Sequence, residues 1–446
     1  MTNEPMTNVR WVMNDERRGT MRRRWVVGLL TLVVGMAFAA GPADAGTKLI
    51  RLTFYYPVGV AGPLAKVIGE MTDKFNKDNP GIEVVPVYSG DYDPTLQKVQ
   101  TAVMAGNPPD IFIVEISELP TLLAMNAIIP LDDYVKKAEA GKYWDDFFPA
   151  FRENSVVKGK IWWIPFQRST PVFYWNKELF KKAGLDPERP PQTWAELKET
   201  AKKLTVREGN EVKQWGVTVS GGWNDWLFEA FVRQNGSWLI NPEGTKVNFD
   251  SKEAVEALEF WVDLMYKEKV GPPHSTWGST PPDFVAQRTA MLYHSTGILT
   301  FLRNSAKFDF GVAFMPKNKT FGAEVGGGNL AISRKIPKER QDAAWKFIEW
   351  MTSSENAAQW SIASGYVATR KSAYDVPAMK EFAAKDPRYL VAREQLRYAA
   401  GKMMAPNFQK IREILKKQLD DAVDGKVSPK EAMVTVQKQV ETVIKR

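Results

Sequence analysis

Apolar residues recur along the chain at two spacings, which predict alternating strands and helices. Residues 49–56, "LIRLTFYY", form a short apolar run typical of a strand, and apolar positions then recur at helical spacing from Leu64 to Phe75. The runs "IEVVPVY" and "DIFIVE" predict two further strands, with a helix over residues 93–105 between them. This order predicts βαβ units and a mostly parallel sheet, which binds ligands at the carboxyl ends of its strands.

The same alternation restarts after residue 165. A strand over 171–175 leads into a helix over 177–184. Capping boxes at Thr193–Glu196, Asp250–Glu253 and Thr352–Glu355 predict the starts of three further helices. Two strands are predicted at 289–293 and 309–314, and two C-terminal helices follow, the second starting at Ser428 with Glu431 as its capping partner. We therefore predict two α/β lobes and a C-terminal helical tail.

Residues 1–45 have the pattern of a secretory signal peptide. From Met21, the expected start of translation, the chain reads "MRRRWVVGLLTLVVGMAFAAGPADA", with basic residues before an apolar run and a small-x-small cleavage pattern ending at Ala45. A membrane anchor would need about 20 apolar residues, and this run is shorter. The chain has no cysteine to carry a lipid. We expect export to a bacterial periplasm with cleavage after Ala45, and no lipoprotein.

Charge and composition argue for a globular protein without a nucleic-acid partner. Hydrophobic residues make up 44% and charged residues 25% of the chain. The net charge is +8, of which residues 1–45 contribute six arginines and four acids. The remaining charges are scattered, with lysine and glutamate alternating along predicted helices, as on solvated helix faces.

Known catalytic patterns are absent from the sequence. The chain has only two histidines and no cysteine. It has no metal-ligand motif, no nucleophile elbow, no phosphate-binding loop and no dinucleotide fingerprint, so we expect no metal and no cofactor. A glycan-cleaving enzyme would need two opposed carboxylates, and the candidates Asp91, Glu115, Glu118 and Asp225 are not paired by any spacing.

Aromatic residues stand beside polar residues in several predicted loops. The chain has 16 tryptophans and 13 tyrosines, among them Tyr92 in "GDYDP" and Trp223 and Trp226 in "GGWNDW". Flat rings cover the apolar face of a polyhydroxylated ligand, while hydroxyls and amides bind its rim. The glycine cluster 326–328 is interpreted either as a tight turn or as a place where backbone N–H groups approach a ligand.

These motifs resemble the extracellular solute-binding proteins of bacterial ABC importers (family 1 type), and within them the glycerol-3-phosphate-binding proteins. The resemblance spans nearly the whole chain after residue 45. It is carried by "FNKDNPGIEVVPVYSGDYDPTLQ", "AGNPPDI", "PFQRSTPVFYWNKELFKKAGLDPERPPQTWAEL", "GGWNDW", "SENAAQW", "SGYVATRKSAYD" and "DGKVSPKEA".

The resemblance implies a type II periplasmic-binding-protein fold, in which two α/β lobes joined by hinge crossovers close on a ligand between them. The first lobe is expected to comprise residues 46–165 and 297–351, and the second lobe residues 166–296 and 352–446. The implied partners are a small ligand and the membrane permease of an ABC importer. The implied state is a monomer that breaks no bond in its ligand.

The family's ligand-binding positions map onto this sequence one by one. The implied ligand-binding residues are Tyr92, Ser169, Trp194, Trp223, Ser295, Gly327 and Tyr366. Further candidates from the same motifs and their neighbours are Glu115, Arg168, Thr170, Trp226, Gly328, Arg370 and Lys402.

Two positions depart from the family pattern. Where the family has a ligand-binding arginine, this sequence has Met404, and the nearest cation is Lys402. The family's glutamate after the third strand falls on Ile116, so that Glu115 stands where a tyrosine is expected. Arg168, where relatives have a small polar residue, is an alternative anion clamp or a solvated rim charge.

Three functions therefore remain open at the sequence level. The first is a periplasmic binding protein for glycerol-3-phosphate or a glycerophosphodiester. The second is the same role for a neutral mono- or disaccharide. The third, from another class, is a secreted glycan-cleaving enzyme. In the first hypothesis, Arg370 is a second candidate, besides Arg168, for the cation that binds the phosphate.

Overall fold

A five-stranded sheet forms the core of the first lobe. The computed structural model describes residues 49–444. The strands lie in the order β2-β1-β3-β14-β6. Their bounds are Ile50–Tyr56 (β1), Ile82–Tyr88 (β2), Ile111–Glu115 (β3), Ile164–Ser169 (β6) and Gly326–Ile332 (β14). Strand β1 is parallel to β2 and β3, as predicted, but β14 is antiparallel to both β3 and β6, so the sheet is mixed rather than mostly parallel.

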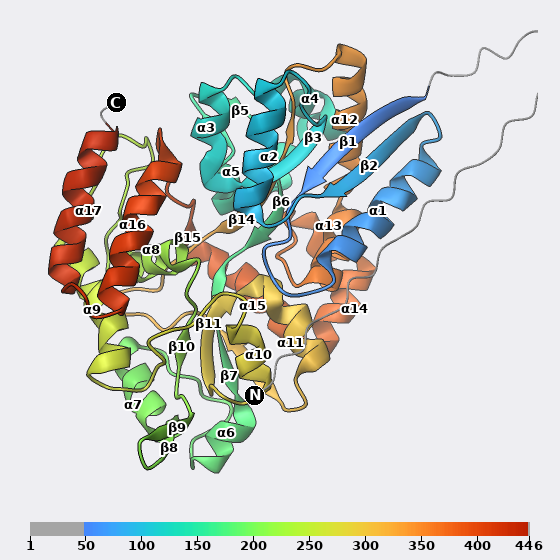
Figure 1. Cartoon of the computed structure of the whole chain (residues 1–446). Coiled ribbons are helices and arrows are strands. Elements are labelled where there is room, and N and C mark those ends of the chain that lie inside the picture. Colours follow the sequence, from blue (N-terminus) through green and yellow to red (C-terminus); the bar gives the residue numbers. More distant parts are fainter. Residues whose placement is uncertain (1–48, 445–446) are drawn as a thin grey trace, which may run out of the picture. The chain divides into compact units, whose positions relative to one another are not determined.

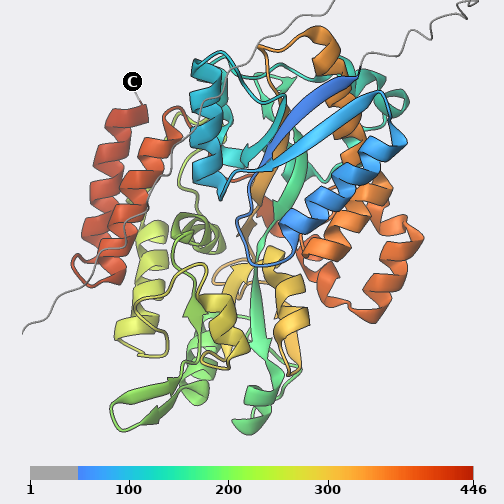
Figure 2. The same cartoon turned by 45° about the vertical axis from the view of Figure 1, so that its right-hand side comes forward.

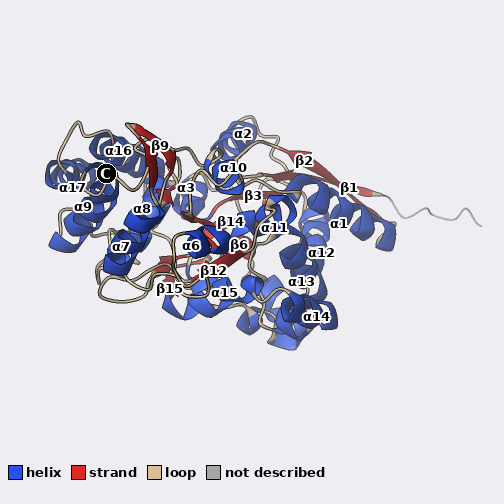
Figure 3. Ribbon diagram, turned by 90° about the horizontal axis from the view of Figure 1, so that it is seen from below, coloured by secondary structure: helices blue, strands red, loops and turns tan. Residues whose placement is uncertain are grey.

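Helices cover both faces of this sheet. Strand β3 is buried along its whole length. Ile111 and Ile113 pack with α1 (Leu64–Asp78) and α12 (Lys338–Met351), whereas Phe112 and Val114 pack with α2 (Tyr92–Met104). Successive side chains of a strand point to opposite faces, so a continuous apolar run predicts burial on both. Figure 3 shows these helices on the two sides of the strands.

A four-stranded sheet forms the core of the second lobe. Its order is β10-β11-β7-β12, with bounds Thr218–Val219 (β10), Met291–Ser295 (β11), Pro171–Asn176 (β7) and Phe310–Ala313 (β12). Strand β7 lies antiparallel to both β11 and β12. The predicted strands at 171–175, 289–293 and 309–314 correspond to these three elements.

The chain passes from the first sheet to the second at Thr170. Strand β6 ends at Ser169 in the first sheet, and β7 begins at Pro171 in the second. Figures 1 and 2 show this pair of strands running from one lobe into the other. The chain returns between β12 and β14, which lie in different sheets.

Several elements depart from the lobe ranges that we expected. Residues 166–169 of β6 fall in the range assigned to the second lobe, yet β6 belongs to the first sheet. Strand β12 falls in the range assigned to the first lobe, yet it pairs with β7 in the second sheet. Helix α13 (Ser354–Ser364) falls in the range assigned to the second lobe, yet its Trp360 stacks on Phe166 in the first lobe, with ring centroids 4.9 Å apart. The spacing of apolar residues predicts helices and strands, but it does not predict the lobe in which each one packs.

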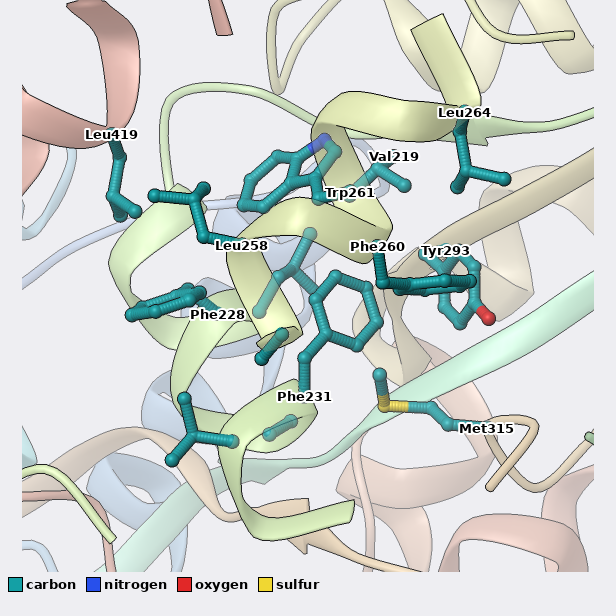
Figure 4. Close-up of a cluster of buried hydrophobic side chains, with 14 of the residues drawn as sticks. Val219, Phe228, Phe231, Leu258, Phe260, Trp261, Leu264, Tyr293, Met315 and Leu419 are labelled. Atoms are coloured by element: carbon teal, nitrogen blue, oxygen red, sulfur yellow. The ribbon is translucent and has the colours of Figure 1, made fainter. Parts of the chain in front are cut away.

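Five helices surround the apolar core of the second lobe. They are α7 (Trp194–Leu204), α8 (Asn224–Gln234), α9 (Lys252–Tyr266), α16 (Phe408–Val423) and α17 (Pro429–Ile444). Phe231, Phe260 and Trp261 meet edge to face in this core (Figure 4). The predicted C-terminal helices α16 and α17 lie side by side against α8 and α9 (Figures 1 and 2).

Two of the four predicted capping boxes are confirmed. The N–H of Glu196 donates to the hydroxyl of Thr193, and the N–H of Gln192 donates to the Glu196 carboxylate. Ser428 and Glu431 cap α17 in the same reciprocal way. The prediction of Asp250 as a cap was wrong by one residue, because the hydroxyl of Ser251 accepts from the N–H of Ala254. The box predicted at Thr352 was also wrong by one residue, because the hydroxyl of Ser353 accepts from the N–H of Asn356 at the start of α13.

The remaining helices and strands connect the two lobes or extend them. Their bounds are α3 Leu119–Ala124, α4 Asp132–Lys137, α5 Pro149–Glu153, β4 Val156–Val157, β5 Lys160–Ile161, α6 Lys177–Lys182, β8 Val206–Glu208, β9 Glu211–Gln214, α10 Thr280–Val285, α11 Leu299–Ser305, β13 Ala323–Glu324, α14 Pro377–Lys385, α15 Arg388–Gln395 and β15 Ala399–Ala400.

The predicted signal peptide, with its start at Met21 and cleavage site at Ala45, lies outside the described residues. Among residues 49–444, no helix combines the length and the apolar character needed to cross a membrane.

Candidate functional site

A small cavity lies where the two lobes meet. Its volume is about 30 Å³, which is room for about two water molecules. Three strands reach it with their carboxyl ends: β3 with Glu115, β6 with Ser169 and β11 with Ser295. Ligands of α/β folds bind at this end of the strands, so the position agrees with the prediction from the strand order.

The start of β14 closes one wall of the cavity. Gly327 has a φ of +100°, and an added Cβ would lie 1.6 Å from the carbonyl oxygen of Gln167 on β6. Only glycine fits between the two strands here. The glycine cluster therefore allows a close approach of strands beside the cavity, in place of a simple tight turn.

Two buried tyrosines supply hydroxyl groups. Tyr92 begins α2 and Tyr366 follows α13, and both line the cavity. Burial raises the pKa of both phenols, so they remain neutral hydrogen-bond donors. The Tyr92 hydroxyl donates to Oε1 of Gln167 at 3.3 Å.

Lys402 is a cation at the cavity wall. Its Nζ lies 3.4 Å from Oε1 of Glu115 and 3.3 Å from Oδ2 of Asp225. Burial alone would lower the pKa of Lys402, but the two carboxylates outweigh this effect and raise it. The same attraction, shared with Arg412, overcomes burial and lowers the pKa of Asp225 to about 2. Lys402 and Asp225 thus form a charged pair at neutral pH, with the carboxyl group of Glu115 beside the same ammonium.

A second cation lies behind this pair. Nη1 of Arg412 is 2.7 Å from Oδ1 of Asp93, and its Nε is 3.4 Å from Oδ2 of Asp225. Its guanidinium lies 4.2 Å from the ring centre of Trp223, which lines the cavity. Asp93 belongs to α2 of the first lobe and Arg412 to α16, so this ion pair joins the lobes.

Nine of the residues singled out from the sequence lie together around this cavity. They are Tyr92, Glu115, Ser169, Trp223, Trp226, Ser295, Gly327, Tyr366 and Lys402. Met404, which matches the position of the family's arginine, lines a different cavity. Lys402, the nearest cation in sequence, does line the cavity.

Trp194 lies in the core of the second lobe and not at the cavity. Its ring stacks on Phe260 with centroids 4.1 Å apart, and its Nε1 donates to Oε1 of Gln234 at 3.0 Å. Only 6% of the residue is exposed. The contacts of Trp194 thus support packing rather than the ligand contact that the resemblance implied.

Arg370 also lies away from the cavity. Its guanidinium binds the carboxylates of Glu139 and Asp146 at 2.5 and 2.6 Å. It is buried against the rings of Tyr143 and Phe147. Because its charge is satisfied within the first lobe, Arg370 does not have the environment expected of a rim charge.

Thr170 and Gly328 flank the cavity without lining it. The hydroxyl of Thr170 accepts from Nε2 of Gln395 at 3.1 Å. A Cβ on Gly328 would lie 2.5 Å from Ile113. Both residues shape the crossing strands instead of facing the cavity.

Arg168 is buried behind the cavity wall. It is fully buried, and its Nη1 donates to Oδ1 of Asn329 at 2.9 Å. Its guanidinium lies 5.0 Å from the ring centre of Phe151. It is neither a ligand-contacting clamp nor a solvated rim charge in this structure.

Three lining residues were not singled out from the sequence: Gly59, Val60 and Trp277. Gly326, which also lines the cavity, belongs to the glycine cluster noted in the sequence. Nε1 of Trp277 donates to the carbonyl oxygen of Gly59 at 2.9 Å, which joins the two lobes beside the cavity. Gly59 and Val60 follow the carboxyl end of β1, where the strand order predicts ligand binding, but no local signal distinguishes Trp277 from core tryptophans.

Comparison with known proteins agrees with this geometry. The family model described as bacterial extracellular solute-binding protein matches residues 70–389. The sn-glycerol-3-phosphate-binding periplasmic protein UgpB of Escherichia coli K12 is 31% identical over 437 residues, which cover 92% of this chain and 96% of that protein.

Solved structures share the fold. UgpB of Mycobacterium tuberculosis in complex with glycerophosphocholine aligns with a TM-score of 0.79 at 24% identity, covering 89% of this chain and 98% of that one. Maltose-bound MalE3 of T. maritima aligns with a TM-score of 0.77 at 25% identity, covering 88% and 99%. The architecture is that of two-domain periplasmic solute-binding proteins, with a helical C-terminal region.

Proposed function

The chain belongs to the bacterial extracellular solute-binding proteins, and we propose that its ligand is glycerol-3-phosphate or a glycerophosphodiester. The family assignment and the relatives make it a periplasmic binding protein for a small polar ligand. The ligand proposal extends the binding specificity named for the E. coli relative to this chain.

The observation that carries the proposal is the kind of group around the cavity. Neutral donors from Tyr92, Tyr366, Ser169 and Ser295 line it together with the ammonium of Lys402. Phosphate oxygens accept hydrogen bonds only, and bonds from charged donors to phosphate are the stronger ones. The carboxylate of Glu115 supplies an acceptor for a glycerol hydroxyl.

A neutral mono- or disaccharide is the second candidate ligand. Two carboxylates within 3.4 Å already balance the charge of Lys402. Trp223, Trp226 and Trp277 line the cavity, and aromatic rings suit the apolar faces of sugars. Maltose-bound MalE3 has the same fold.

We infer that the protein is not an enzyme. Its relatives are transport proteins that bind their ligand. Glycan cleavage needs a general acid, but Asp225, with its pKa lowered to about 2, stays ionised at neutral pH. Glu118, whose pKa burial raises to about 7, is not among the residues that line the cavity.

Delivery of the ligand completes the proposed role. The protein would be exported by the segment 1–45, cleaved after Ala45 without a lipid, and would act as a monomer. Closure of the lobes on the ligand would create the form that an ABC importer permease recognises.

A thermal-shift panel on the protein without residues 1–45 tests the ligand. A ligand that binds only the folded form raises Tm with its concentration relative to Kd. We expect shifts with glycerol-3-phosphate or glycerophosphocholine and none with glucose, maltose or trehalose. A shift with a sugar alone would overturn the proposal, and release of hydrolysis products from any compound would revive the enzyme hypothesis.

A pair of matched variants locates the binding. Tyr366→Phe removes one hydroxyl from the cavity wall, and we expect it to lower the affinity by about ten-fold, the cost of leaving a bound ligand oxygen without its donor. Tyr398→Phe removes a hydroxyl from a partly exposed residue outside the cavity and should leave the affinity unchanged.

A further inference from the structure

Arg168 is a buried cation without a carboxylate partner. The side chain is fully buried, yet Nε and Nη2 have no hydrogen-bond partner among the described residues. Its one hydrogen bond goes to the neutral amide oxygen of Asn329. Burying a charge without an opposite charge costs free energy of folding. We therefore expect Arg168 to have a function that offsets this cost.

The residues next to the backbone of Arg168 line the cavity or adjoin residues that line it. Ser169, the next residue, lines the cavity, and Gly327 is its register partner on β14. Its carbonyl oxygen accepts from the N–H of Val367, the neighbour of the cavity residue Tyr366. Successive strand residues face opposite sides, so Ser169 faces the cavity and Arg168 lies one layer behind.

The other two buried cations near the cavity differ from Arg168. Lys402 and Arg412 each have a carboxylate oxygen within 3.4 Å. Burial lowers the pKa of Arg168 to about 9, and Glu115, at the cavity, is the nearby charge that opposes this shift most. The guanidinium therefore remains positive at neutral pH and interacts electrostatically with the cavity.

We propose that Arg168 determines ligand specificity by selecting a negatively charged ligand through its field, without touching it. In a buried, low-dielectric region such a charge acts over a longer range than at the surface and is little screened by salt. The ligand's negative charge then supplies a counter-charge for a guanidinium that makes no ion pair among the described residues. This inference rests on the proposed function, because it deepens the preference for a phosphate ester.

A purely structural role would not require the charge. Arg168 packs against Phe151 and bonds to Asn329, and a methionine fills similar space with an apolar stem. Replacing buried charged groups by neutral residues of similar volume often leaves a protein equally or more stable. The two roles are therefore separable by variants that keep the packing and change the charge.

Two variants remove the uncompensated charge in different ways. Arg168→Met deletes it. Asn329→Asp places a carboxylate where the Asn329 oxygen now lies 2.9 Å from Nη1, which gives Arg168 a counter-charge at nearly unchanged side-chain volume. The bond from Asn329 Nδ2 to Ser155 is replaced by one that the Ser155 hydroxyl donates to the new carboxylate. Arg168→Lys keeps the charge and loses the guanidinium geometry.

Isothermal titration with glycerol-3-phosphate, at low and at 0.5 M salt, tests the proposal. We expect Arg168→Met and Asn329→Asp to raise Kd about ten-fold at both salt concentrations, because a buried charge acts at a low effective dielectric and is little screened by salt. Arg168→Lys should bind within about two-fold to three-fold of wild type. The ligand-free Tm of Asn329→Asp should not fall.

The outcomes separate the two proposals. If wild type binds the phosphate ester and Asn329→Asp binds it equally well, the inference about Arg168 is overturned and the proposed function stands. If wild type binds only neutral sugars, the proposed ligand is overturned, and the inference fails with it. Should Arg168→Met not fold, Asn329→Asp and Arg168→Lys still decide the question.

Discussion

Lys402 and Arg412 can be buried because carboxylates surround them. Asp225 is within 3.4 Å of both cations and is itself fully buried. Removing one partner of such a group leaves an uncompensated charge, which is why buried ion pairs are costly to break. Each of these charged side chains thus tolerates burial because of neighbours that are close in space but distant in sequence.

Trp194 makes a residue-level prediction about packing. Trp194→Ala removes the ring that stacks on Phe260, and we expect it to lower the free energy of unfolding by about 3 to 5 kcal/mol because it leaves a cavity in the core. Ligand affinity, measured where the variant is folded, should change less than about two-fold. Chemical denaturation and titration provide the two measurements.

The matched variant is Trp277→Phe at the cavity wall. It loses the hydrogen bond from Nε1 to the Gly59 carbonyl and should weaken ligand binding several-fold with little loss of stability. The reverse pattern, with Trp194→Ala weakening binding at unchanged stability, would restore Trp194 as the ligand contact that the resemblance implied.

At the scale of elements, helices α2 and α16 are joined across the two lobes. Asp93 lies in the first turn of α2, where the helix dipole favours a negative charge. Its carboxylate binds Arg412 of α16 at 2.7 Å, and 56% of the Asp93 side chain is exposed. The pair lies outside the cavity and stabilises the closed arrangement directly.

Asp93→Asn should therefore weaken ligand binding by opposing closure. Exposed ion pairs contribute about 0.2 to 1 kcal/mol, so we expect a two-fold to five-fold rise in Kd at low salt. The difference from wild type should disappear near 1 M salt, where the Debye length is about 3 Å. Titration calorimetry at both salt concentrations measures the effect.

Asp145→Asn provides the control for this prediction. Asp145 makes a similar exposed pair with Arg152, 3.0 Å away within the first lobe. It should leave Kd unchanged at every salt concentration. An equal effect of both variants would mean that the Asp93 pair has no particular part in closure.

On the scale of the whole molecule, the cavity is too small for its proposed ligand in the present arrangement. Its volume is about 30 Å³, and contacts such as Trp277–Gly59 and Lys402–Glu115 bridge the lobes around it. Entry of a ligand therefore requires the lobes to separate at the crossings near Thr170 and between β12 and β14.

We expect the ligand-free protein to open in solution. Small-angle scattering should show a radius of gyration that falls when ligand is added, and tryptophan fluorescence should change with the same midpoint. Trp277→Phe should reduce the fluorescence change, whereas Trp238→Phe, on a residue that is 40% exposed, should not. An unchanged radius of gyration at saturating ligand would contradict hinge closure.

The local elements and most of the cavity wall are predictable from the amino-acid sequence. Periodicity located β1, α1, α2 and β3, because strand and helix spacings are properties of neighbouring residues. The family motifs indicated Tyr92, Ser169, Ser295, Gly327 and Tyr366, which meet around one cavity.

Which charges and rings face that cavity depends on contacts between residues far apart in the chain. Lys402 meets Glu115 across 287 residues, and Arg412 meets Asp93 across 319, so no local spacing records either pair. Trp194 and Trp277 look alike in sequence, but one stacks in the core and the other lines the wall. The alternation of side chains along β6 turns Arg168 away from the cavity that Ser169 lines. Its Nε and Nη2 have no hydrogen-bond partner among the described residues, which can be seen only once all neighbouring elements are in place.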